Sequence, residues 1–158
     1  MTADSLTLRR RRLSRGETTV IVAGTLLVLD LVLAPWHDFG VDVSELRQFG
    51  IELPSFHLRR RGVQSPNAVF GIAAAVIAAL MVADLVAARL SAAVPRIEQI
   101  HLVAGAIVLG LVVAKLLAND DFLAVGAWLA VGLAAALAYG GFLLSQETAN
   151  AGARISGP

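Results

Sequence analysis

The sequence predicts an all-α integral membrane protein, a four-helix bundle with one extracytoplasmic loop of about 28 residues between its first two helices. The chain is 57% hydrophobic with a mean hydropathy of +0.74, above the ~45–50% apolar content of a soluble domain. Charged residues lie almost wholly between four apolar runs, each about long enough for the ~20 residues that a bilayer requires. The runs cover 18–36, 67–88, 102–118 and 122–145.

The first helix is predicted over about 17–36, after a basic cytoplasmic tail at 1–15. Ser14 and Glu17 fit a capping box, in which a hydroxyl and a carboxylate three residues apart satisfy free N–H groups of the first turn. Trp36 closes the apolar run and is predicted to anchor it at the headgroup interface, where tryptophan is enriched.

The same run shares one property with a cleaved signal peptide, because arginines precede an apolar stretch. However, Asp30 interrupts the stretch, and Pro35 directly follows the small residues that would permit cleavage. The run is also longer than the usual apolar core of ~7–15 residues. We therefore expect it to be retained as a membrane anchor.

Three further helices are predicted over about 66–88, 96–118 and 121–145. Ser65 and Pro66 supply an N-cap and a first-turn proline for the second helix. The acidic turn at 119–121 is so short that the third and fourth helices must be antiparallel neighbours. The last segment, 146–158, is predicted to be a disordered cytoplasmic tail, because it is small and polar.

Arginine distribution predicts that both termini lie in the cytoplasm, since short cytoplasmic loops carry the excess of positive charge. With that orientation the inner side holds Arg9, Arg10, Arg11, Arg12, Arg15, Arg89, Arg96 and Arg154. The outer side holds Arg47, Arg59, Arg60 and Arg61. The inner arginines before the first helix, Arg9 to Arg12 and Arg15, are also expected to touch anionic lipid.

The outer loop, 37–65, contains alternating apolar residues, among them Phe39 and Val41. This pattern fits a short β-hairpin, while the residues at 44–49 fit a partial helix on the bilayer surface, and the sequence leaves both open. The aromatic residues of the loop indicate that it folds back over the mouth of the bundle.

Small residues in the last helix predict close helix packing, which is the main source of association between helices in lipid. The predicted packing residues are Gly126, Ala130, Gly132, Ala136 and Gly140. They fall on two rows about 200° apart at 3.6 residues per turn. Either the helix lies at the centre of the bundle, or one row packs internally and the other contacts a second copy of the chain.

Ionisable residues inside the apolar runs are candidates for function, because each costs about 2.5–3.5 kcal/mol at the bilayer centre. Asp30 and Lys115 lie at a similar depth, roughly 9 Å below the outer boundary at 1.5 Å per residue, and could form an ion pair. Asp84 could pair with Arg89 or His101 near the inner boundary. The alternative is that Lys115 and Asp84 extend to the headgroups.

Several chemistries are absent from the sequence. With no cysteine, the chain has no disulfide or thiolate site. His101 is predicted on the inner side and His37 and His57 on the outer side, which excludes a bis-histidine haem within the bundle. His37 and His57 could meet in the outer loop near Asp38 and Asp42 as a weak metal site, but we predict no haem, no metal and no other cofactor. The runs contain no paired carboxylates or nucleophile–base set, so we predict no enzymatic activity, and we expect no nucleic-acid binding.

A leucine-rich first helix that ends in Leu33-Ala34-Pro35-Trp36, an outer loop of about thirty residues and three Ala/Val/Leu-rich helices resemble the small uncharacterised four-span membrane proteins of high-GC actinobacteria. That resemblance implies no known activity. We expect a non-enzymatic partner or subunit of an envelope assembly, which contacts itself or another membrane protein through the last helix or the outer loop. The alternative is a small oligomeric proton- or cation-coupled transporter that uses Asp30.

Overall fold

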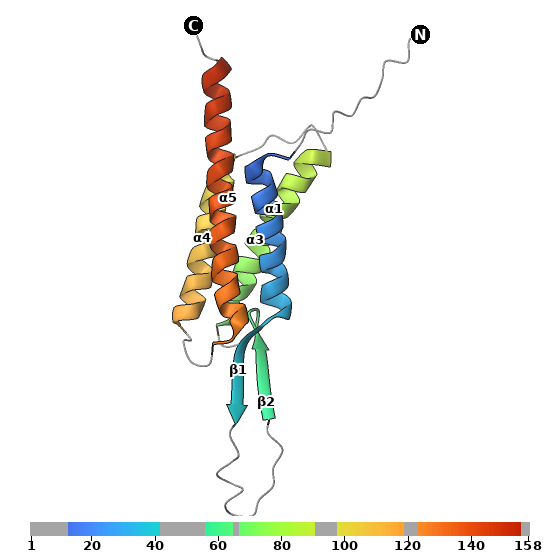
Figure 1. The fold of residues 1–158 in the computed structure, drawn as a ribbon, viewed down its shortest axis with the longest axis vertical. Helices are drawn as coiled ribbons and strands as arrows, with labels where there is room; N and C mark the ends of the chain where they lie inside the picture. The colour runs from blue at the N-terminus through green and yellow to red at the C-terminus, as the bar shows by residue number, and fades with distance from the viewer. Residues whose placement is uncertain (1–12, 42–55, 65–66, 91–97, 119–122, 156–158) are drawn as a thin grey trace, which may run out of the picture.

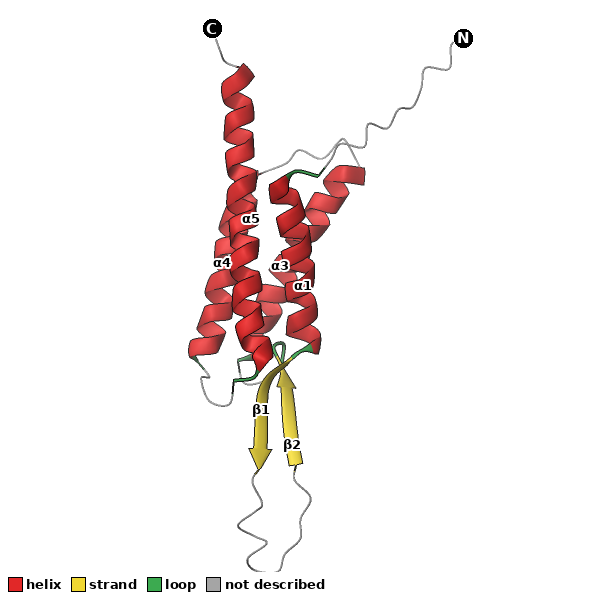
Figure 2. Ribbon diagram, viewed as in Figure 1, coloured by secondary structure: helices red, strands yellow, loops and turns green. Residues whose placement is uncertain are grey.

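The computed structural model describes residues 13–41, 56–64, 67–90, 98–118 and 123–155. Its helices are α1 (Arg15–Leu33), α3 (Ala68–Leu90), α4 (Glu98–Leu117) and α5 (Val125–Ile155). Its strands are β1 (Pro35–Val41) and β2 (Phe56–Arg61), which lie together at one end of the helices (Figures 1 and 2). The structure is mainly helical, and all four helices are long and apolar enough to cross a membrane.

The four helices are arranged as a ring, in which α1 and α4 each pack against both α3 and α5 (Figure 1). Consecutive helices run in opposite directions, so the start of α1 and the end of α5 lie at the same end of the bundle. We call this the terminal end, and the opposite end, which carries the strands, the hairpin end. Each helix has two neighbours, so α5 occupies a corner of the ring and not its centre.

The start of α1 confirms the predicted capping box. The Ser14 hydroxyl accepts a hydrogen bond from the Glu17 backbone N–H at 3.1 Å, and the Glu17 carboxylate accepts one from the Ser14 N–H at 2.9 Å. These bonds satisfy two N–H groups that have no partner within the helix.

Two predicted helix ends are wrong. The first helix ends at Leu33 and not at 36, because Pro35 disfavours helical backbone at the residue before it, and Ala34 is extended at φ −74° and ψ 146°. The last helix continues to Ile155 and not to 145. Residues 146–155 contain three alanines and no proline, so they can extend a helix that is already formed.

The two strands form an antiparallel pair with register Asp38↔Arg59 and Val41↔Phe56, as the hairpin interpretation of the loop predicts. The alternative helix at 44–49 lies outside the described residues. The strands point away from the helices (Figure 1), so the prediction that the loop folds back over the bundle is wrong for the part that is described. Each strand pairs with the other along one edge only, and Ala124 donates to the Trp36 carbonyl at the base of β1.

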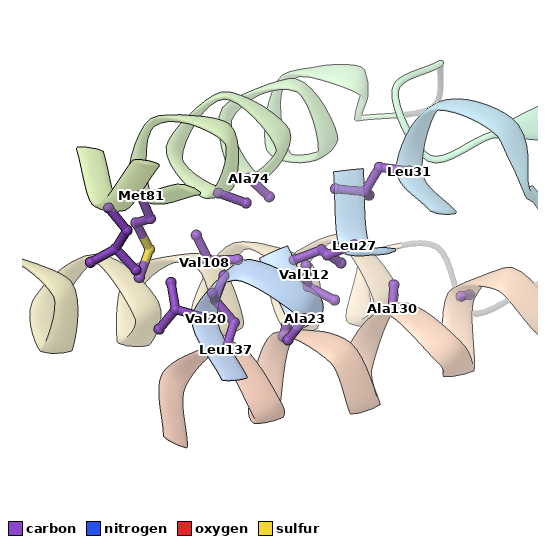
Figure 3. Packing of buried hydrophobic residues seen from close by; sticks show 14 of the residues in the cluster. Val20, Ala23, Leu27, Leu31, Ala74, Met81, Val108, Val112, Ala130 and Leu137 are labelled. Atoms are coloured by element: carbon purple, nitrogen blue, oxygen red, sulfur yellow. The ribbon is translucent and has the colours of Figure 1, made fainter. Parts of the chain in front are cut away.

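The core of the bundle consists of small and aliphatic side chains from all four helices (Figure 3). Glycine allows the closest approaches. A Cβ added at Gly24 of α1 would lie 2.7 Å from Val82 of α3, and one at Gly105 of α4 would lie 2.8 Å from the Ala138 Cα of α5. Such contacts bring backbones together, as expected for helices in lipid.

The predicted packing residues of α5 divide into two groups. Gly126, Ala130 and Gly140 are buried against other elements, and Ala136 is partly buried against the core. Gly132 is exposed, and a Cβ added there would have nothing within 4 Å. Its predicted role in packing within the chain is therefore wrong, because the ring leaves this face of α5 without a neighbour.

Candidate functional site

Asp30 lies in the last turn of α1 and is buried. Its Oδ2 accepts a hydrogen bond of 3.1 Å from the indole Nε1 of Trp36. Its Oδ1 has no hydrogen-bond partner among the described residues. Burying a carboxyl group with one neutral donor is unfavourable in free energy, so Asp30 lowers the stability of the fold at this position.

Trp36 lies in β1 and is 0% exposed. Its backbone carbonyl accepts a hydrogen bond of 2.8 Å from Ala124, just before α5. A Cβ added at Gly62 would lie 2.8 Å from the indole, so the residue after β2 must be glycine for the ring to fit. The indole therefore joins the first strand, the end of the second strand and two helices.

The burial of Trp36 corrects its predicted role as an interface anchor, which requires a ring in contact with headgroups. The exposed tryptophan is Trp128, in the first turns of α5, with 62% of its surface accessible. Sequence position alone favoured Trp36, because it ends an apolar run. The hydrogen bond to Asp30 instead draws its ring into the bundle.

Lys115 lies in the last turn of α4 and is 1% exposed. Its Nζ donates to the carbonyl of Gln64 at 3.3 Å and to that of Asn67 at 3.2 Å, both in the turn between β2 and α3. The same nitrogen lies 5.7 Å from the centre of the Trp36 ring, within range of a cation–π interaction. The alternative in which Lys115 extends to the headgroups is wrong, because its ammonium group points inward.

Asp30 and Lys115 thus meet through Trp36. The structure places the carboxyl group at the indole N–H and the ammonium group over the ring, where the sequence leaves a direct ion pair open. We call Asp30, Trp36, Gly62 and Lys115 the joint. It binds the base of the hairpin to α1 and α4, and among the described residues Lys115 also donates to two backbone carbonyls.

No protein-family model, curated protein or solved structure matches this chain.

A second set of charges lies at the terminal end. Glu17 of α1 is buried and forms an ion pair with Arg89 of α3. Asp84 of α3 approaches buried His101 of α4, with Oδ2 and Nε2 3.3 Å apart. Their angle does not make a hydrogen bond, but the distance allows an ion pair when the imidazole is protonated. Of the two partners predicted for Asp84, the structure brings His101 to it.

Sequence reasoning assigned Glu17 only to the helix cap. The signal it missed is spacing, because Glu17 shares a face of α1 with Val20, Gly24 and Leu27, all of which are buried. A carboxylate on the buried face of a helix requires a cation from a neighbouring helix. The sequence also missed Glu147 of α5, whose Oε1 accepts a hydrogen bond of 3.4 Å from the Gly16 N–H, because the helix was expected to end before it.

No group of three or more His, Asp or Glu side chains that could hold a metal ion occurs in the described part of the chain. The register of the hairpin pairs His37 with Arg60 and His57 with Gly40, so the two outer histidines are not paired with each other. His37 is itself buried. The described polar groups connect helices and strands to one another.

Proposed function

We propose that the chain is a multi-pass protein of the cell (inner) membrane, with both termini in the cytoplasm and residues 37–65 outside. Two observations support this proposal. The start of α1 and the end of α5 lie at the same end of the bundle. The outward faces of the helices carry exposed aliphatic side chains such as Leu26, Leu80 and Ile107, which a lipid environment would accommodate.

Within that membrane, the proposed role is that of a non-enzymatic partner or subunit of an envelope assembly, with the hairpin as the contacting element. The observation that carries this role is the joint. A loop that only connected two helices would have no need of a buried tryptophan, a buried lysine and a buried aspartate at its base. These groups fix the direction of the strands relative to the helices, which reduces the ordering cost of binding a partner.

The test is site-specific photocrosslinking of the full chain in native membranes. A photoreactive residue replaces Arg59, which is exposed on β2, or Val76, which is exposed on the middle of α3. We expect a discrete protein adduct from position 59 and mainly lipid adducts from the matched position 76. The yield from position 59 should fall when Lys115→Met loosens the joint, since the hairpin would lose its fixed direction.

Equal yields of protein adduct from both positions would contradict the proposal that the hairpin binds a partner. A position-59 yield that Lys115→Met leaves unchanged would contradict the role of the joint in that binding. The amount of each variant in the membrane is measured as the control, because a variant that fails to accumulate would also give fewer adducts. Fusions that report opposite sides for the two termini would contradict the orientation.

The unpartnered Oδ1 of Asp30 favours a second candidate, a small oligomeric proton- or cation-coupled transporter. An ion that crosses a membrane requires a polar group that can bind and release it within the bundle. Proton-driven flux in vesicles, wild type against Asp30→Asn, tests this candidate. Asparagine can still accept the Trp36 hydrogen bond, so a transporter with this substitution would lose flux and keep its fold. Wild-type flux equal to that of empty vesicles would reject the candidate.

A further inference from the structure

The hairpin end has a defined apolar boundary. The aliphatic residues nearest this end on the four helices are strongly exposed, between 62% and 81% of their surface. They are Leu33 of α1, Val69 of α3, Leu117 of α4 and Val125 of α5. Side chains of this kind favour hydrocarbon over water, so in a membrane they indicate where acyl chains end and headgroups begin.

Arg61 lies just beyond this boundary. It pairs with Pro35, which is two residues after Leu33, so its backbone is at most about 7 Å past the apolar boundary at ~3.3 Å per residue of strand. A headgroup layer is about 5–8 Å thick on each side of the hydrocarbon. The Arg61 backbone therefore lies within the depth of the headgroup layer, from which its long side chain can reach lipid phosphates, and Arg59 lies two residues further out.

The charges around these arginines differ. The Arg59 Nε is 3.4 Å from the Asp38 carboxylate across the ladder, so part of its charge is already compensated. The Arg61 backbone N–H donates to the Gln64 side chain at 2.9 Å, which fixes the turn. Its exposed guanidinium group has no charged partner among the described residues.

We propose that Arg61, with a smaller contribution from Arg59, binds the phosphate of an anionic phospholipid in the outer leaflet. The planar guanidinium group matches phosphate oxygens with two parallel hydrogen bonds. An anionic lipid is preferred to a zwitterionic one because it brings no cation that would be repelled by the two arginines. The proposal rests on the membrane placement proposed above, but it does not require a protein partner.

The experiment measures lipid preference of the full chain in nanodiscs of phosphatidylcholine. Spin-labelled phosphatidylglycerol and phosphatidylcholine are compared, and the ratio of their association with the protein is the readout. We expect Arg61→Gln to lower the preference for the anionic lipid about fivefold, and Arg59→Gln to lower it less. Arginines at the terminal end contribute equally to all variants, so the comparison between variants isolates the hairpin end.

Asp38→Asn supplies a change of opposite sign. It releases Arg59 from its carboxylate, and we expect the anionic preference to rise, which damage to the fold would not cause. Raising the salt concentration should reduce the preference of wild type toward that of Arg61→Gln. Millimolar inorganic phosphate should leave the preference unchanged.

Three results would overturn the proposal. An Arg61→Gln variant with wild-type preference would mean that nearby carboxylates already neutralise this arginine. Displacement of the lipid by inorganic phosphate would mean that the site selects a soluble anion. A chain that does not enter nanodiscs at all would overturn the membrane placement as well, whereas failure of the crosslinking experiment alone leaves the lipid site intact.

Discussion

At the terminal end of the bundle charged side chains of the helices contact one another, whereas at the hairpin end the described contacts of Asp30 and Lys115 are with a tryptophan and backbone carbonyls. The Glu17–Arg89 pair joins α1 to α3, and the Asp84–His101 contact joins α3 to α4. Lys115 instead binds carbonyls of the turn before α3 and lies over Trp36, whose N–H binds Asp30. The terminal end therefore joins helix to helix, and the hairpin end joins helices to the base of the strands.

Because of this difference, the two ends should respond differently to substitution. A direct ion pair depends on two side chains, and removing one leaves the other buried without its charge partner. The joint depends on a single aromatic ring that serves as donor to one charge and as a π surface for the other. Loss of that ring affects both charges at once, so the hairpin end should be the more sensitive of the two.

Trp36→Ala should have the largest effect on stability. It removes a fully buried ring, for which about 3–5 kcal/mol of unfolding free energy is typical, and it leaves Asp30 without its donor. Unfolding in mixed micelles, followed by helical circular dichroism against denaturing-detergent fraction, measures the change. Trp128→Ala is the matched control, and it should cost less than about 0.5 kcal/mol because that ring is exposed. Equal losses in the two variants would contradict the role of the joint.

Breaking the terminal-end ion pair should have the next largest effect. Arg89→Met removes the cation that pairs with buried Glu17 from α3, and a cost of about 3 kcal/mol is expected. A double-mutant cycle with Glu17→Gln should give a coupling of about 1–3 kcal/mol. The same cycle for Asp30→Asn and Lys115→Met should give a clearly smaller coupling, because these residues act through Trp36. Comparable couplings would show that the two ends are held in the same way.

These two ends also show what sequence can predict. The four helices follow from apolar runs of sufficient length, and the cap of α1 follows from the spacing of Ser14 and Glu17. The partner of Asp84 was among the predicted ones, because opposite charges at one depth are visible in the sequence. Each of these inferences uses a local pattern or a simple depth along a helix.

The joint could not be predicted in the same way. The described hydrogen bonds of Lys115 go to carbonyls, which every residue carries, so no residue type marks these two partners. Trp36 was assigned to the surface because its place at the end of an apolar run fits an anchor as well as a buried ring. Gly62 is required only because the indole lies against it, which is a consequence of tertiary packing.

A matched pair of glycines on α5 extends the comparison from charges to backbone contacts. Gly141→Ala should destabilise the bundle by about 1–3 kcal/mol, because the added Cβ would lie 2.5 Å from the His101 carbonyl oxygen of α4. The same detergent unfolding measures the change. A variant as stable as wild type would show that α4 and α5 can separate at the terminal end without loss.

Gly132→Ala should have the smallest effect and the opposite sign. The added methyl group would have nothing within 4 Å, and alanine in a helix is favoured over glycine by about 0.5–1 kcal/mol. Unfolding should therefore require slightly more denaturing detergent than wild type at a protein concentration low enough to keep single copies. If the gain turns into a loss at high concentration, together with a fall in oligomer by analytical ultracentrifugation, a second copy packs on this face of α5. A gain that does not vary with concentration would assign the face to lipid.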